Sequence, residues 1–160
     1  MKRRPGRIRT VFDCNTLIQV VAFEESPSAA CLSLVESGEI ELFISKPTMA
    51  ELRRVLEYPE VLAISPHMTP ERIARFLRWL TFRATLLRRV PHVWDYPRDP
   101  HDEPYLDLAD AAEADFLVTR DKDLLSLMTA HAPIARQFRR GTHPLRVLDP
   151  VGFLKALSHS

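Results

Sequence analysis

The chain has 160 residues, the size of one domain that can bury roughly 70% of its unfolded surface. Hydrophobic residues make up 46% of the chain and charged residues 27%, with a net charge of +1, and this composition excludes wholesale disorder. The two cysteines provide neither a metal-binding spacing nor a disulfide framework, and no apolar run is long enough to span a bilayer. We therefore expect a cytoplasmic protein with a single domain over residues 1–160, in which residues 1–7 are a flexible basic tail.

The apolar pattern of the chain predicts short strands that alternate with helices. In chain order we expect a strand at 8–12, helices at 16–23 and 28–36, a strand at 40–44, and a helix from Ser45 or Thr48 to about residue 56, which Pro59 ends. There follow a helix at 68–87, a strand within 86–94, a loop at 96–104, a helix at 105–114, a strand at 116–118, a helix at 122–128, a strand at 145–148 and a helix at 151–157. This alternation predicts a parallel sheet covered on both faces, with functional sites at the carboxyl ends of its strands.

Acidic side chains fall where these elements meet. Asp13 ends the first strand, Glu51 lies in the first turn of the helix after the second strand, and Asp121 comes just past another strand. Asp102 and Glu103 lie in the loop that opens a helix. In a parallel sheet these positions all face one edge, where four carboxylates repel one another unless a cation lies between them. Such hard oxygen ligands select Mg²⁺ or Mn²⁺.

Each acid also has a purely structural interpretation. Glu51 stands three residues after Thr48 and could complete a capping box, and Asp102 and Asp121 each precede a helix and could be plain N-caps. Asp13 differs from them because it interrupts an apolar run, where an unpaired buried charge costs free energy. The position of Asp13 therefore favours a functional role.

Four segments of the chain resemble, in order, the four acidic motifs of the PIN domain. They are residues 11–18 (VFDCNTLI), 45–52 (SKPTMAEL), 99–106 (DPHDEPYL) and 117–125 (LVTRDKDLL), and the resemblance extends from Arg9 to Leu157. The most similar branch of the family is that of toxins from toxin–antitoxin pairs, related to VapC. The resemblance implies a three-layer α/β/α sandwich with a central parallel sheet, and a metal-dependent ribonuclease activity.

The resemblance also assigns the residues of the site. The metal-site acids correspond to Asp13, Glu51, Asp102 and Asp121. The three aspartates would ligate Mg²⁺ or Mn²⁺ directly, and Glu51 would bind metal or orient its water. Two alternatives stay open, in which Glu103 replaces Asp102 as the third acid and Asp123 shares or replaces the role of Asp121.

Further side chains are expected to support the metal ligands or to hold RNA. Asn15 and Thr119 would orient the ligands, although Asn15 could instead cap the next helix. The RNA backbone would be held by Arg120 and by three arginines of the 68–87 helix, Arg72, Arg75 and Arg78. These arginines could equally be solvated surface charges.

We therefore expect hydrolysis of RNA phosphodiester bonds with one or two metal ions. The biological role that the resemblance suggests is the toxin of a type II toxin–antitoxin pair, with RNA as substrate, an antitoxin protein as partner and a homo-oligomeric state. The alternatives are an RNA-processing or turnover nuclease and a catalytically silent binding module of the same fold. An aspartyl-phosphate phosphatase is disfavoured because Asn15 and Leu17 stand where a second Asp and a Thr are usual.

Overall fold

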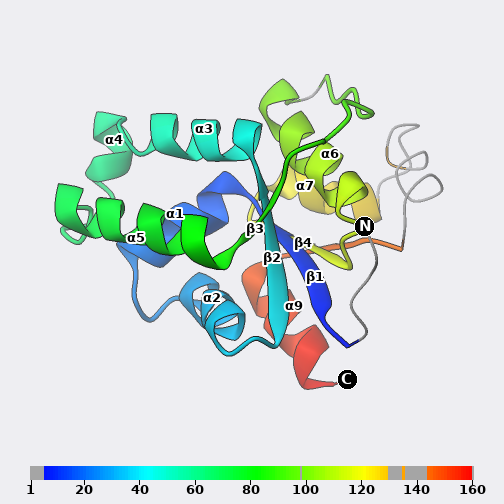
Figure 1. Cartoon of the computed structure of the whole chain (residues 1–160), viewed down its shortest axis with the longest axis horizontal. Helices are drawn as coiled ribbons and strands as arrows, with labels where there is room; N and C mark the ends of the chain where they lie inside the picture. Colours follow the sequence, from blue (N-terminus) through cyan, green and yellow to red (C-terminus); the bar gives the residue numbers. More distant parts are fainter. Residues whose placement is uncertain (1–5, 98, 130–134, 136–143, 160) are drawn as a thin grey trace.

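The structure is a computed structural model that describes residues 6–97, 99–129, 135 and 144–159. Residues 1–5, most of the expected basic tail, lie outside the described residues. Five parallel strands form one sheet (Figure 1). They are β1 (Ile8–Phe12), β2 (Ile40–Ser45), β3 (Thr85–Leu87), β4 (Phe116–Val118) and β5 (Arg146–Leu148).

The strand order is β3-β2-β1-β4-β5, which places β1 at the centre of the sheet. The chain proceeds outward from β1 through β2 to β3, and then returns to the other side of β1 to form β4 and β5. The direction of winding therefore reverses between β1 and β4. In open parallel sheets, ligands bind outside the carboxyl ends of the strands at such a reversal.

Helices cover both faces of this sheet (Figure 1). α6 packs against β1 and β2, whereas α9 packs against β4 and β5 and also contacts α2. The α-helices are α1 (Cys14–Ala22), α2 (Pro27–Glu36), α3 (Lys46–Val55), α4 (Pro59–Leu62), α5 (Pro70–Arg83), α6 (Glu103–Ala111), α7 (Lys122–Leu125) and α9 (Pro150–Ser158). Two short 3₁₀ helices are η1 (Pro100–Asp102) and η2 (Ser126–Met128).

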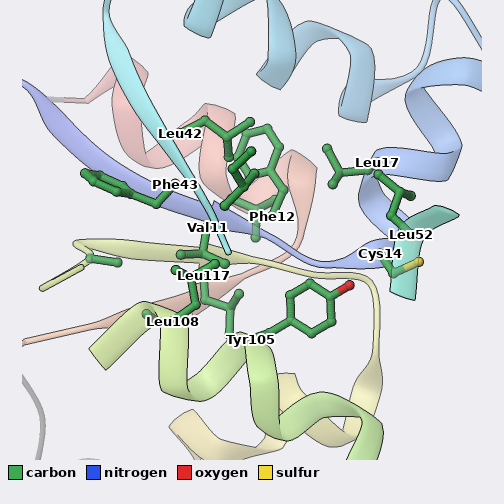
Figure 2. Packing of buried hydrophobic residues seen from close by; sticks show 14 of the residues in the cluster. Val11, Phe12, Cys14, Leu17, Leu42, Phe43, Leu52, Tyr105, Leu108 and Leu117 are labelled. Atoms are coloured by element: carbon green, nitrogen blue, oxygen red, sulfur yellow. The ribbon is translucent and has the colours of Figure 1, made fainter. Parts of the chain in front are cut away.

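The hydrophobic core lies on both sides of the sheet. On one side Phe12 and Phe116 meet the ring of Phe153 from α9 edge to face, with ring centroids 6.3 and 5.1 Å away. On the other side Val11 and Leu117, which are partners in neighbouring strands, lie towards α6 (Figure 2). Burial on both faces explains why most positions of these strands are apolar. Arg9 and Thr10 of β1 are buried as well, and their side chains donate hydrogen bonds to backbone carbonyls. The predicted three-layer α/β/α sandwich is confirmed.

Some element bounds differ from those predicted. The expected helix at 68–87 is the shorter α5, and β3 follows it at Thr85–Leu87, so the strand expected within 86–94 begins one residue earlier and ends sooner. Pro59 does more than end a helix, because it begins α4, where proline is favoured in the first turn. Within the described residues there is no helix with both the length and the apolar character needed to cross a bilayer.

Candidate metal centre

Asp13 joins β1 to α1 and is only 4% exposed. Its Oδ1 accepts hydrogen bonds from the backbone N–H and the hydroxyl of Thr16, at 2.9 and 2.7 Å, and its Oδ2 accepts one from the hydroxyl of Thr119. Burial raises the pKa of Asp13, although the hydrogen bonds from Thr119 and Thr16 act in the opposite direction. These three donors fix the orientation of a buried carboxylate at the point where the winding reverses.

Asp13 lines a cavity of about 120 Å³, which we call the acidic cavity. Its carboxylates are Asp13, Glu51, Asp99, Asp102 and Asp121. Its other lining residues are Cys14, Asn15, Val55, His101 and Tyr105. Residues from all four of the acidic segments in the sequence therefore meet here, although they are far apart along the chain.

Three of these carboxylates form a compact group. One oxygen from each of Asp99, Asp102 and Asp121 lies within 4.8 Å of the other two. Oδ2 of Asp102 is buried and has no hydrogen-bond partner among the described residues. Burial, followed by the neighbouring charges of Asp121, Asp99 and Asp13, raises the pKa of Asp102 to about 8. A divalent cation would relieve this repulsion, and a donor set made only of oxygen fits Mg²⁺ or Mn²⁺.

Two capping alternatives are wrong. The N-cap of α3 is Ser45, whose hydroxyl accepts from the Thr48 N–H at 3.3 Å, so Thr48 and Glu51 do not form a capping box. Glu51 consequently lies one turn further into α3 than predicted, and burial raises the pKa of its carboxyl group. Because Asp13 caps α1, Asn15 does not, and it lines the acidic cavity instead.

Asp121 and Asp102 both stand at helix N-termini, but only one of them caps. Oδ1 of Asp121 accepts a hydrogen bond from the Asp123 N–H at 2.8 Å and caps α7. The Asp102 side chain makes no capping hydrogen bond to α6. Asp121 therefore combines a structural contact with a place in the acidic cavity, whereas a plain capping role for Asp102 is wrong.

The comparisons with known proteins agree with this geometry. The family model described as the PIN domain matches residues 9–123, which is more than half of the chain. The chain belongs to the PIN domain family. Among solved structures, the crystal structure of PAE2754 from Pyrobaculum aerophilum matches with a TM-score of 0.56 and 17% identity, over 98% of this chain and 94% of that chain. That likeness shows a shared fold. No curated protein matched the chain.

The two alternate acids lie outside the lining of the acidic cavity in this PIN domain. Oε2 of Glu103 is 4.0 Å from Nε2 of His92, in a separate group that includes Asp95. Asp123 donates its backbone N–H to Asp121 but does not line the cavity. This geometry favours Asp102 and Asp121 over Glu103 and Asp123 as metal ligands.

Sequence reasoning missed two residues of the PIN domain site, Asp99 and Tyr105. Asp99 caps η1 by accepting from the His101 N–H at 3.1 Å, and residues three apart in a 3₁₀ turn share one side, which brings Asp99 beside Asp102. The Asp-x-x-Asp spacing was the available signal. Tyr105 is 2% exposed, and apart from the weakly polar thiol of Cys14 its hydroxyl has no hydrogen-bond partner among the described residues. Figure 2 shows this hydroxyl directed towards Cys14 at the cavity wall.

The arginines predicted to bind RNA are distributed between two places. Arg72 donates to the Val21 carbonyl at 3.1 Å and forms a 2.5 Å ion pair with Glu24, at the end of α1 away from Asp13. Two more arginines of α5, Arg75 and Arg78, are exposed. Arg120 is also exposed and stands next to Asp121. RNA binding by the α5 arginines stays a prediction, and the guanidinium of Arg72 is already paired with Glu24.

Replacing Asp121 by Ala or by Asn should separate its capping contact from its charge. Both changes remove the same negative charge, but Asn keeps the oxygen that accepts from the Asp123 N–H. We expect Asp121→Ala to be less stable than Asp121→Asn by about 1 kcal/mol, the usual cost of losing an N-cap. Urea unfolding of both variants without metal measures this difference. Equal midpoints would mean that the cap contributes nothing.

Proposed function

We propose that this PIN domain is a metal-dependent endoribonuclease that hydrolyses RNA phosphodiester bonds. The observation that carries the proposal is the acidic cavity, where a buried oxygen of Asp102 has no hydrogen-bond partner among the described residues. PIN domains are generally nucleases. Carboxylates brought together around a Mg²⁺ or Mn²⁺ ion are suited to cutting phosphodiester bonds.

The aspartates of the cavity would hold the ion. Asp99, Asp102 and Asp121 supply the compact group of oxygens, and Asp13 adds a carboxylate whose orientation Thr119 fixes. A bound Mg²⁺ or Mn²⁺ ion would supply Lewis acidity, which lowers the pKa of a bound water molecule and offsets negative charge on the phosphate. The role of Thr119 is to keep Asp13 in one rotamer, so that the site is formed before substrate arrives.

Glu51 would accept a proton from the attacking water, and Tyr105 would donate a hydrogen bond to the phosphate. The raised pKa of the Glu51 carboxyl group makes it a better proton acceptor for the attacking water than an ordinary glutamate. Burial raises the pKa of Tyr105, so its hydroxyl stays protonated and can donate a hydrogen bond. A phosphate oxygen in the cavity would be the acceptor for that hydrogen bond.

The purified protein is expected to cleave single-stranded RNA with Mn²⁺ or Mg²⁺ and to be inactive in EDTA. Asp13→Asn should abolish cleavage without unfolding the domain, because the amide oxygen can still accept from Thr16 while the negative charge is lost. Gel analysis of a labelled RNA, with circular dichroism of both proteins, tests this. Equal rates for wild type and Asp13→Asn in matched preparations would refute the nuclease assignment, and single-stranded DNA of the same sequence is the control for substrate class.

For the biological role we propose the toxin of a type II toxin–antitoxin pair. The support is the resemblance of the acidic motifs to toxins related to VapC, and the alternative is a nuclease of RNA processing or turnover. A small reading frame with a DNA-binding motif immediately upstream of the gene would support the toxin role, together with a complex of the two products. An antitoxin partner and a homo-oligomeric state are parts of this proposal, and size-exclusion chromatography with light scattering measures both.

A further inference from the structure

A second cavity, of about 390 Å³, carries positive charge in this PIN domain. Arg120 and Lys122 line it, together with Gln19 from α1 and with Ser26 and Ser28 from the start of α2. We call it the basic cavity. Its size is within the range of pockets that hold a small molecule such as a nucleotide.

The basic cavity is connected to the acidic cavity along two elements. In the loop between β4 and α7, Asp121 lines the acidic cavity, while its neighbours Arg120 and Lys122 line the basic one. On α1, Asn15 lines the acidic cavity, and Gln19, four residues later, lines the basic one. Residues four apart lie on the same face of a helix, so the two cavities are neighbours along that face.

The cations of the basic cavity are available to a ligand. Arg120 and Lys122 are both exposed, and neither side chain has an ion pair or hydrogen bond with another described residue. One acid, Asp149, also lines this cavity, but its Oδ1 already accepts the Gly152 N–H at 2.7 Å. Arg72 on α5 differs, because it is paired with Glu24.

We infer that the basic cavity binds the sugar-phosphate backbone of the RNA strand next to the bond that is cut, an inference that rests on the proposed function. The acidic cavity is about 120 Å³, too small for more than the reacting phosphate and its ion, so the strand must leave it. Arg120 and Lys122 are the cations beside its ligand Asp121. The RNA strand and the metal site would therefore meet along the loop between β4 and α7.

The α5 arginines are a poorer fit for this contact. Arg72 reaches the carbonyl of Val21, which lies eight residues beyond Asp13 on α1, and that separation corresponds to about 12 Å along a helix. An RNA strand bound at Arg72 would not be continuous with a phosphate in the acidic cavity. The two surfaces can therefore be distinguished by charge removal at each.

The test compares paired alanine variants, all in an Asp102→Asn background so that RNA is not cut. The probe is a 5′-fluorescein-labelled single-stranded RNA, and its anisotropy is measured over a range of NaCl concentrations. Arg120→Ala with Lys122→Ala should weaken binding by about tenfold or more and lower the slope of log K against log salt by about 1.4, since each lost phosphate contact removes about 0.7.

A matched control removes two positive charges elsewhere. Arg7 precedes β1 and Lys155 lies in the last turn of α9, so both are at the opposite edge of the sheet from the cavities. Arg7→Ala with Lys155→Ala should leave RNA affinity close to that of the background protein. A third pair, Arg75→Ala with Arg78→Ala, tests the α5 surface. Melting temperatures establish that every variant is folded.

Each outcome decides the inference. A loss confined to the Arg120 and Lys122 pair supports it. The inference is overturned if the Arg120 and Lys122 pair binds RNA as tightly as the Arg7 and Lys155 pair. It is also overturned if the loss is confined to the Arg75 and Arg78 pair. In either case, cleavage of RNA by the wild type still supports the proposed function. If the wild type neither binds nor cleaves RNA, both the proposed function and this inference are wrong.

Discussion

Replacing Asp102 by Asn should reduce RNA cleavage by at least about 10³-fold, while the same kind of change at its neighbour, Glu103→Gln, should leave most of the activity. Loss of a metal ligand removes several kcal/mol of transition-state stabilisation, and each loss of about 1.36 kcal/mol slows the reaction tenfold. Both side chains have one buried oxygen without a hydrogen-bond partner among the described residues, but only Asp102 lines the acidic cavity, whereas Oε2 of Glu103 lies 4.0 Å from Nε2 of His92.

Single-turnover cleavage of labelled RNA with Mn²⁺ measures both variants. Each substitution replaces a carboxylate by an amide of the same shape, so a difference between them reports on position and not on size. Melting temperatures without metal provide the control for folding. Because Asp102 makes no capping hydrogen bond, Asp102→Asn should melt at or above the temperature of the wild type. An inactive Glu103→Gln beside an active Asp102→Asn would reverse the assignment of the third acid.

The stability of the metal-free protein should fall as the pH rises from about 4 to about 8. The pKa of Asp102 is about 8 in the folded protein, against an ordinary value of 3.8. A folded state with the higher carboxyl pKa binds more protons than the unfolded chain between these values, so its stability is lost as the pH rises through this window. Burial raises the pKa values of Asp13 and Glu51 as well, which adds to the effect with the same sign.

Mn²⁺ should reverse this trend, because it binds the ionised carboxylates and competes with their protons. At an Mn²⁺ concentration about 100 times the Kd, the expected stabilisation is about 2.7 kcal/mol. For a domain of this size that corresponds to a rise in Tm of roughly 5–11 °C. The rise should be largest near pH 8 and should shrink towards pH 5, where protons occupy the site.

A thermal-shift titration with Mn²⁺ at several pH values measures this behaviour. Asp102→Asn is the matched variant, since it removes together a metal ligand and a carboxyl group whose pKa is raised to about 8. It should show a flatter dependence of Tm on pH and little response to Mn²⁺. A wild type that does not respond up to millimolar Mn²⁺ would contradict the metal site, and an unchanged pH dependence in Asp102→Asn would contradict the role of its carboxyl group.

The sequence by itself determined the two strands β1 and β4 and the acids that follow them. The central position of β1 in the sheet is known only from the structure. The strands predicted at 8–12 and 116–118 agree with β1 and β4, because a parallel strand that is buried on both faces is mostly apolar, and only Arg9 and Thr10 of β1 depart from this pattern. An acid placed at or just past the end of such a strand, such as Asp13 or Asp121, then lies at the carboxyl edge of the sheet. These are local patterns, and they can be seen without knowing how distant segments pack.

Only the tertiary structure decided which neighbouring side chains reach the acidic cavity. Asp102 and Glu103 are adjacent at the start of α6, and successive helical residues point about 100° apart, so the rotation of α6 against the sheet selects one of them. The ion pair that engages Arg72 joins it to Glu24, 48 residues earlier in the chain, and no local pattern encodes such a contact. The reason is physical: periodicity fixes which side of its own element a residue occupies, but packing between elements fixes what that side faces.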